Sequence, residues 1–192
     1  MYYYPYMYRY SYPYYDHVSI YPYGSQPMYW PVPAEFAHAG PFGDMQLASD
    51  NRIVGRDYGK EPFVVNIEEA TERNRTFRTA IWTGNHLQVT LMSIDVGGDI
   101  GLEVHPTVDQ FLRIEEGQGI VRMGNSRDHL TFEKRVSDDD AIMVPAGTWH
   151  NLINTGNRPI KLYTIYAPPE HPFGTVHETQ ADAIAAEESH FE

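Results

Sequence analysis

The fold of this chain is decided by two stretches, GGDIGLEVHPTVDQFLRIEEG at residues 97–117 and DDAIMVPAGTWHNLIN at residues 139–154. Both consist of short runs of apolar residues that are separated by turn-forming glycine, proline and aspartate. In the first stretch Glu103 and His105 are two residues apart, so on one strand both side chains point to the same face. The pattern predicts neighbouring β-strands that carry polar side chains toward a shared interior.

Two further polar residues of these stretches follow turns and open new strands. A proline turn precedes Gln110, which can reach the same space across a hairpin. His150 stands at the head of another strand, after the turn PAG at 145–147. Four potential ligands can therefore converge inside a barrel. We predict that a metal ion is held by Glu103, His105, Gln110 and His150.

The rest of the chain from residue 79 onward continues in the same manner. Short β-type runs follow one another at a spacing of roughly 8–12 residues, with turn residues between them. The runs are TAIW, LQVTLMSI, GLEV, DQFLRIEE, GIVRM, HLTFEKRV, AIMVP, HNLIN and IKLYTIY. Such a series predicts an antiparallel sandwich or barrel.

Short helices are expected before and after the strand series. Asn66 followed by Glu69 has the pattern of a capping box and predicts a brief helix. The stretch 179–188 opens with an N-cap signature and is rich in alanine, so we expect a terminal helix packed on the outside. Residues 63–65 are predicted to form a short strand.

The spacing of the first stretch resembles a signature motif of the cupin superfamily. That motif runs Gly, five residues, His, one residue, His, three or four residues, Glu, six residues, Gly. From Gly97 to Gly117 every spacing fits, while Glu103 replaces the first histidine and Gln110 replaces the glutamate. Asp109 would satisfy the shorter spacing but would leave Gly117 out of register, so the motif favours Gln110.

The second stretch is similar to the other cupin motif, which runs Gly, five residues, Pro-x-Gly, two residues, His, three residues, Asn. The matching residues are Pro145, Gly147, His150 and Asn154, and Asp139 replaces the leading glycine. The resemblance covers residues 60–180. It implies an all-β fold, the antiparallel double-stranded β-helix or jelly-roll barrel of the cupins, here with short flanking helices.

The resemblance also implies a site for one divalent metal ion, which cupins usually hold with three imidazoles and one carboxylate. Here the carboxylate, the two imidazoles and a neutral amide oxygen would come from Glu103, His105, His150 and Gln110. Oxygen donors favour Mn(II), Fe(II) or Zn(II) over copper. Sugar-phosphate isomerases of the superfamily use a similar mixed set, so the chain resembles small cupins of the mannose-6-phosphate isomerase type at least as well as the dioxygenases.

Four other residues near the motifs have both a functional and an ordinary structural interpretation. Tyr163 and Tyr166, on the last barrel strand, are candidates for a proton-transferring base, and the sequence does not rank them. His171 and His177 are expected at the surface or in caps rather than as ligands.

Tyrosine and proline are concentrated at the start of the chain. Twelve of the 15 tyrosines lie in residues 1–30, in a low-complexity stretch that begins MYYYPYMYRYSYPYY. Because proline disrupts any ladder and no period is present, we expect a disordered tail. Its composition favours association or cross-linking and resembles the tails of bacterial spore coat proteins, which implies deposition on a spore coat and contacts with other coat proteins.

Changes of composition divide the chain into four predicted segments. They are a tail over 1–34, a linker and edge segment over 35–62, a barrel over 63–178, and a C-terminal helix and tail over 179–192. The net charge of −12 belongs to the part after residue 34, because Arg9 and Asp16 cancel within the tail. An acidic body lacks the clustered Lys and Arg that nucleic acid requires, so we expect no nucleic-acid partner.

Several classes of protein are excluded by what the sequence lacks. With no cysteine there is no disulfide scaffold, zinc finger or thiol nucleophile. There is no apolar run of ~18 residues, so no membrane span is expected. The first residues lack the positive segment and aliphatic stretch of a signal peptide, so we expect synthesis in the cytoplasm.

Three functions remain open on the sequence. The first is a metal-dependent isomerase or dioxygenase that acts on a small sugar-like or carbonyl substrate. The second is a spore-coat or surface-assembly protein, in which a barrel that is usually a homodimer serves as a scaffold and the tail mediates association. The third is a non-catalytic module that binds a small molecule.

Overall fold

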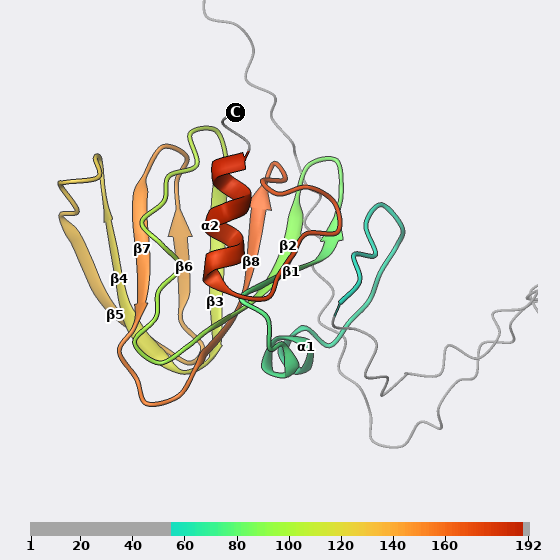
Figure 1. Cartoon of the computed structure of the whole chain (residues 1–192), viewed down its shortest axis with the longest axis horizontal. Helices are drawn as coiled ribbons and strands as arrows, with labels where there is room; N and C mark the ends of the chain where they lie inside the picture. Colours follow the sequence, from blue (N-terminus) through green and yellow to red (C-terminus); the bar gives the residue numbers. More distant parts are fainter. Residues whose placement is uncertain (1–54, 190–192) are drawn as a thin grey trace, which may run out of the picture. The chain divides into compact units, whose positions relative to one another are not determined.

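The structure is a computed structural model, and it describes residues 55–189 (Figure 1). The predicted tail over 1–34 and most of the predicted linker over 35–62 lie outside the described residues. The described part consists of two facing β-sheets and two short helices. In chain order the elements are α1 (Ile67–Arg73), β1 (Arg78–Thr83), β2 (Gln88–Ile94), β3 (Asp109–Glu116), β4 (Gln118–Gly124), β5 (Phe132–Ser137), β6 (Ala141–Val144), β7 (Trp149–Asn154), β8 (Ile160–Ala167), β9 (Val176–His177) and α2 (Gln180–Ser189).

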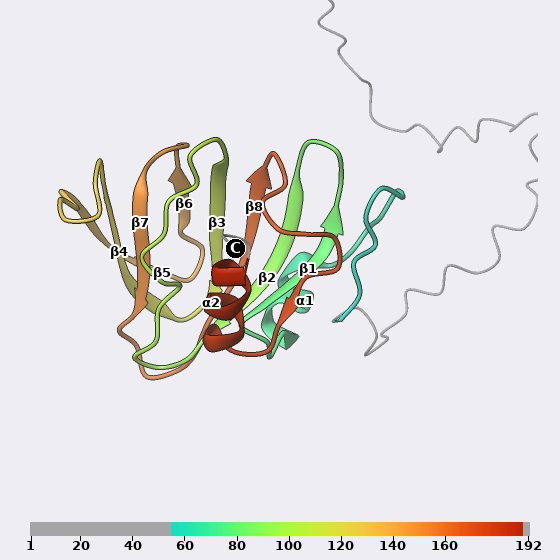
Figure 2. The same cartoon turned by 45° about the horizontal axis from the view of Figure 1, so that its top comes forward.

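All strand pairs in the described part are antiparallel. The larger sheet has the strand order β6-β3-β8-β2-β1-β9, and the smaller sheet has the order β5-β4-β7 (Figure 2). The segment 99–105 continues the smaller sheet beyond β7, because isolated bridges pair Asp99 with Ile153 and Glu103 with His150. The prediction of an antiparallel all-β barrel with short flanking helices is confirmed.

The space between the sheets is apolar toward one end and polar toward the other. In the apolar part, paired positions on β3, β8 and β2 hold Ile114, Leu162 and Met92. Four residues away on each strand, paired positions hold Gln110, Tyr166 and Gln88, each at most 3% exposed. Because residues an even number apart on a strand share a face, these polar groups point into the same interior. The apolar core therefore supports a polar site at one end of the barrel.

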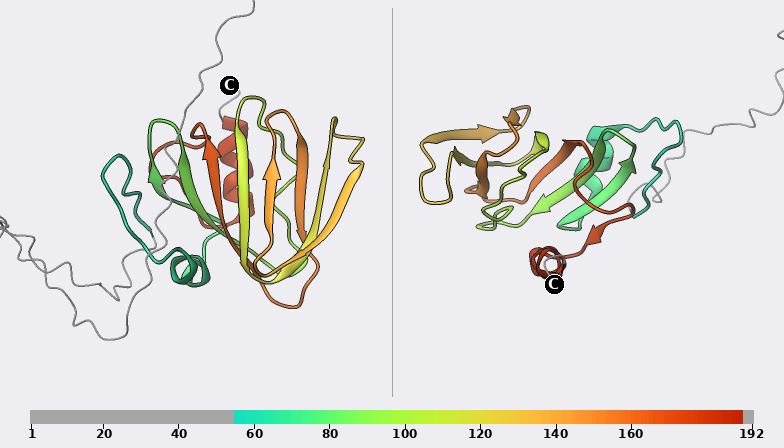
Figure 3. Two further views of the ribbon diagram at one scale, coloured as in Figure 1. Left: turned by 180° about the vertical axis from the view of Figure 1, so that it is seen from behind. Right: turned by 90° about the horizontal axis from the view of Figure 1, so that it is seen from above.

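Both predicted helices are present. The N-cap Asn66 accepts a hydrogen bond of 3.2 Å from the backbone N–H of Glu69, as the capping box predicts. Helix α2 lies on the outside of the barrel (Figure 3), and its first turn is closed by reciprocal hydrogen bonds between Thr179 and Asp182. None of the helices within residues 55–189 has the length and apolar character needed to cross a membrane.

One predicted strand is absent and another is irregular. Residues 63–65 do not pair; instead Phe63 stacks on Tyr58 with ring centroids 4.4 Å apart, and Val65 packs against the helix and the sheet. The run 101–104 forms one isolated bridge, because Gly101 has a φ of 90° and its N–H bonds the side chain of Asp99. Local contacts replace strand pairing in residues 63–65. In the run 101–104 they only interrupt it, because Ile100 and Glu103 on either side of Gly101 still donate backbone hydrogen bonds to β7.

Candidate metal centre

Three of the four predicted ligands converge at the polar end of the barrel. Glu103 and His105 lie on the segment 99–105 and His150 lies on β7; Glu103 and His150 exchange two backbone hydrogen bonds of 3.1 and 2.9 Å. One ligand atom from each side chain lies within 4.8 Å of the other two. Glu103 Oε1 is 3.4 Å from His105 Nε2 and 3.3 Å from His150 Nε2. One carboxylate and two imidazoles therefore face a common point.

Contacts on the far side of each imidazole decide which nitrogen faces this point. His150 Nδ1 lies 3.0 Å from the carbonyl oxygen of Thr148, which can only accept a hydrogen bond. His105 Nδ1 lies 3.0 Å from Glu170 Oε1. When Nδ1 carries the proton of a neutral imidazole, Nε2 presents its lone pair. Both rings are thus held with Nε2 toward this point, the nitrogen through which each neutral ring would bind a metal.

Gln110 enters the same interior from β3. Its side chain is buried, and its amide nitrogen donates a hydrogen bond of 3.3 Å to Thr164 Oγ1, which leaves the carbonyl oxygen Oε1 for another partner. The neighbouring Asp109 is exposed, and its carboxylate accepts a hydrogen bond from the backbone N–H of Ala146. Alternation along the strand therefore turns Gln110 inward and Asp109 outward.

The four predicted ligands share an unusual property. Each has a buried polar atom without a hydrogen-bond partner among the described residues: Glu103 Oε1, His105 Nε2, Gln110 Oε1 and His150 Nε2. Leaving one such group unsatisfied costs roughly 1–3 kcal/mol. Two ligand atoms bound ~2.1 Å from one metal at the tetrahedral angle lie about 3.4 Å apart, which matches the 3.3 and 3.4 Å between Glu103 and the imidazoles. This donor set fits a divalent metal ion.

Neighbouring charges keep the carboxylate of Glu103 ionised, as a metal ligand must be. Burial disfavours ionised Glu103, but its contacts with the two imidazoles and the positive charge of Arg78 outweigh burial and hold its pKa well below the usual range. Arg78 is 1% exposed, and its Nη2 lies 3.9 Å from Glu103 Oε2. Burial also disfavours the imidazolium of His105, whereas Glu103 and Glu170 raise the pKa of His105 to about 9. Metal binding must therefore release a proton from His105.

A cavity of ≈ 700 Å³ opens beside these residues. This volume is within the range of pockets that hold small molecules. Its walls include Glu103, His105, Trp149, Glu170, His171 and His177. His171 and His177, which were expected at the surface or in caps rather than as ligands, are both half-buried and line this cavity, because the chain after β8 turns back toward it.

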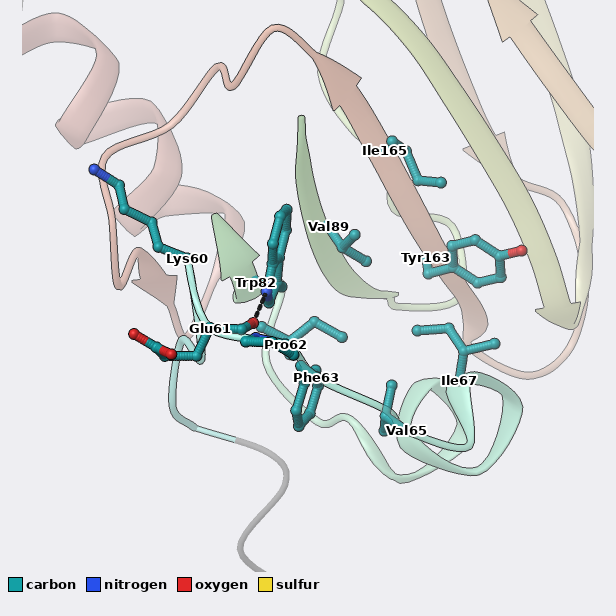
Figure 4. A pocket seen from close by; sticks show the side chains of 11 residues that line it. Lys60, Glu61, Pro62, Phe63, Val65, Ile67, Trp82, Val89, Tyr163 and Ile165 are labelled. Atoms are coloured by element: carbon teal, nitrogen blue, oxygen red, sulfur yellow. Dashed lines mark hydrogen bonds between the residues drawn. The ribbon is translucent and has the colours of Figure 1, made fainter. Parts of the chain in front are cut away.

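The two candidate tyrosines lie on opposite faces of β8. Tyr166 is fully buried, and its ring centroid lies 5.5 Å from that of His105. Tyr163 lines an apolar pocket on the outer face together with Trp82 and Phe63 (Figure 4). The odd spacing of the tyrosines on the strand accounts for this separation. Burial raises the pKa of Tyr166 to about 12, so at neutral pH it keeps its proton and serves as a hydrogen-bonding group rather than a base.

Sequence reasoning missed two charged residues of the site. The position of Arg78 could have been predicted, because it lies two residues before the buried Ala80, on a strand whose other residues are apolar or small. No sequence pattern indicates Glu170, because its contact with His105 depends on how the chain after β8 folds back.

Glu170 offers a test of the histidine orientation. We expect Glu170→Ala to weaken Zn²⁺ binding by about 10–100-fold, because the ring of His105 loses its fixing acceptor. Glu170→Gln, which keeps an acceptor oxygen, should recover part of the loss. Zn²⁺ affinity is measured by competition with a chelator, with exposed Glu178→Ala as the control. An affinity unchanged in Glu170→Ala would show that His105 is oriented without Glu170.

The backbone at the motif turns explains two of the sequence features. Gly117 has a φ of 101°, and a Cβ there would lie 2.9 Å from Ile160 Cα, so a larger residue is excluded. Asp139, which stands where the motif has glycine, also has a left-handed φ of 71°. Its exposed carboxylate accepts a hydrogen bond of 2.7 Å from Arg113 Nη2.

Comparisons with known proteins agree with the fold. The profile of the family described as the cupin domain matches residues 90–166. YrkC of Bacillus subtilis (strain 168) is 61% identical over 176 residues, which are 91% of this chain and 94% of YrkC. L612 of Acanthamoeba polyphaga mimivirus is 42% identical over 115 residues, covering 59% of this chain and 70% of L612. The crystal structure of BH2720 from Bacillus halodurans is similar with a TM-score of 0.67 and 68% identity, covering 68% of this chain and 98% of that chain.

Proposed function

The chain belongs to the cupin superfamily, and from this premise we propose that it is a metal-dependent enzyme with one divalent ion held by Glu103, His105, Gln110 and His150. The main support is that four buried ligand atoms lack hydrogen-bond partners in the described part of the chain. Two imidazoles combined with two oxygen donors favour Mn(II), Fe(II) or Zn(II).

The proposed reaction is a proton transfer next to a carbonyl group of a small substrate, as in an isomerase. When bound, the metal would supply Lewis-acid polarisation of the carbonyl oxygen. Glu103, which is ionised, would offset part of the metal's charge, and the two histidines would direct their Nε2 lone pairs at it. Glu170 has a side chain 30% exposed at the cavity wall, and it is the carboxylate placed to exchange a proton with substrate or water.

Two experiments test this function. Elemental analysis of the purified protein should find one Mn, Fe or Zn per chain. The zinc- and iron-loaded forms are then incubated with small hydroxycarbonyl compounds in D₂O, with and without oxygen. We expect exchange of the carbon-bound proton in the anaerobic zinc form. Turnover that requires iron and oxygen would identify a dioxygenase instead, and metal without turnover in any arm would identify a binding module.

A second proposal concerns the Tyr/Pro-rich segment 1–34, which lies outside the described residues. The match with YrkC covers 91% of this chain and so extends into the first 54 residues. We propose that this segment mediates self-association or attachment to a surface assembly such as a spore coat. Deleting residues 1–33 should reduce association in sedimentation experiments and leave the metal content unchanged; association that persists after the deletion would contradict the proposal.

A further inference from the structure

A basic side chain lies on the wall of the cavity that also contains the metal-ligand candidates. The wall includes Arg127 together with Glu103, His105 and Trp149. Arg127 is exposed, and a guanidinium group keeps its proton throughout the pH range in which proteins are folded. The cavity wall therefore carries a permanent positive charge that does not come from a metal ion.

Arg127 belongs to a tight turn between β4 and β5. Ser126 and His129 form an isolated bridge, and the N–H of His129 donates to the carbonyl oxygen of Ser126 at 3.1 Å, so Arg127 is a central residue of the turn. A Cβ at Gly124 would collide with the backbone of His129, so the two arms of the hairpin approach closely. Gly124 also pairs with Trp149 of the cavity wall. The backbone of Arg127 is thus fixed relative to the cavity.

Another part of the wall is the chain after β8, which buried side chains hold against the barrel. Gln88 donates from Nε2 to the carbonyl oxygen of His171 and accepts at Oε1 from the N–H of His171, both at 2.9 Å. The N–H of Gly174 donates to the buried carboxylate of Asp57 at 3.0 Å. This segment and the β4–β5 turn lie at the same end of the barrel (Figure 1). Two hydrogen-bonded parts of the backbone therefore form the wall around the metal-ligand candidates.

The carboxylates of the wall have partners other than Arg127. Glu103 lies beside the two imidazoles of the metal centre and Arg78, and Glu170 contacts His105. None of the ion pairs among residues 55–189 includes Arg127. The guanidinium group of Arg127 is therefore available to a bound molecule.

The formal charges of the wall indicate which kind of molecule it takes. Two carboxylates and one guanidinium group leave the wall with one negative charge, and a divalent ion would change this to one positive charge. A ligand with a negative charge then balances the cavity. Arginine binds a carboxylate or a phosphate through two parallel N–H···O bonds, which a neutral ligand cannot match in strength.

We propose that Arg127 binds an anionic group of the substrate, a carboxylate or a phosphate, while the carbonyl end of the same molecule lies at the metal centre. This inference rests on the proposed function and names its substrate class, the anionic hydroxycarbonyl compounds. The cavity of ≈ 700 Å³ has room for both ends of a molecule of the size of a sugar. Arg127 determines affinity and specificity and takes no part in proton transfer.

The test compares three probes that share a carbon chain and an aldehyde end: glucose, glucuronate and glucose 6-phosphate. Their affinities for the zinc-loaded full chain are measured by calorimetry at low and high salt. We expect one of the anions to bind about tenfold more tightly than glucose, the effect of a charge-assisted hydrogen bond, and the preference should shrink in high salt. The anion that binds more tightly identifies the group as a carboxylate or a phosphate.

Variants of the arginine connect this preference to one side chain. Arg127→Gln should remove the preference and leave the affinity for glucose unchanged, whereas Arg127→Lys should keep part of it, because the charge remains and the planar fork is lost. Arg122→Gln is the matched control, since Arg122 belongs to the same hairpin but pairs at the surface with Glu133 at 2.7 Å. It should leave all three affinities unchanged.

The outcomes separate this inference from the proposed function. If the wild type holds zinc but binds neither anion more tightly than glucose, the role of Arg127 is refuted and the metal centre stands. A preference that persists in Arg127→Gln would mean that the anion binds the metal or another group, which also refutes it. The comparison is repeated on the chelator-treated chain. A chain that never retains zinc contradicts the proposed function, while its affinities still decide whether Arg127 binds the anion.

Discussion

Replacing Glu103 by glutamine should weaken Zn²⁺ binding on the order of 10²–10³-fold. Structural zinc sites contribute roughly 10–16 kcal/mol, about 2.5–4 kcal/mol for each of four ligands. The amide has nearly the same shape as the carboxylate but carries no charge, so the loss reports the missing anion. The side chain is largely buried, and the backbone bonds with His150 do not involve it, so the fold should persist. Affinity is measured by dialysis against buffered free Zn²⁺ followed by elemental analysis.

The control for this variant is Glu133→Gln on the outer strand β5. It removes the same charge, and Glu133 pairs at the surface with Arg122 at 2.7 Å. Its zinc affinity should equal that of the wild type. A Glu103→Gln protein that retains one zinc per chain under the same dialysis would contradict the assignment of Glu103 as a ligand.

Replacing Asn154 by alanine should lower the free energy of unfolding by about 3–4 kcal/mol. The side chain is 2% exposed and closes the turn between β7 and β8. Its Nδ2 lies within 3.1 Å of the carbonyl oxygens of Ile94, Asp95 and Arg158, and its Oδ1 accepts from the N–H of Gly156 at 2.9 Å. Alanine leaves several of these buried backbone groups unsatisfied.

The loss is measured by denaturant unfolding and should lower Tm by roughly 10 °C for a protein of this size. Asn157→Ala is the matched control, because Asn157 belongs to the same turn but is exposed. It should change the free energy of unfolding by no more than about 0.5 kcal/mol. Equal stability of the two variants would mean that Asn154 does not hold the turn.

Asn154 also shows how a motif can be recognised before its physical role is known. Its place in the sequence pattern was evident, but the four backbone groups that it joins belong to segments far apart in the chain. The ligand candidates are similar. Side chains alternate between the two faces of a strand. Glu103 and His105 are two residues apart and share one face, whereas the neighbours Asp109 and Gln110 point to opposite faces. These are local properties, and they are visible in the sequence.

The antiparallel all-β fold, the two helix caps and the four ligand candidates could therefore be read from residues close together in the chain. Three other features of the site could be known only from the tertiary structure. It turned Tyr166 inward and Tyr163 outward, it brought Glu170 to His105, and it fixed His171 through Gln88. The last two contacts form where the chain after β8 returns over residues distant in sequence. Strand period and turn residues set the local structure, but the partners of a returning segment depend on the packing of the whole barrel.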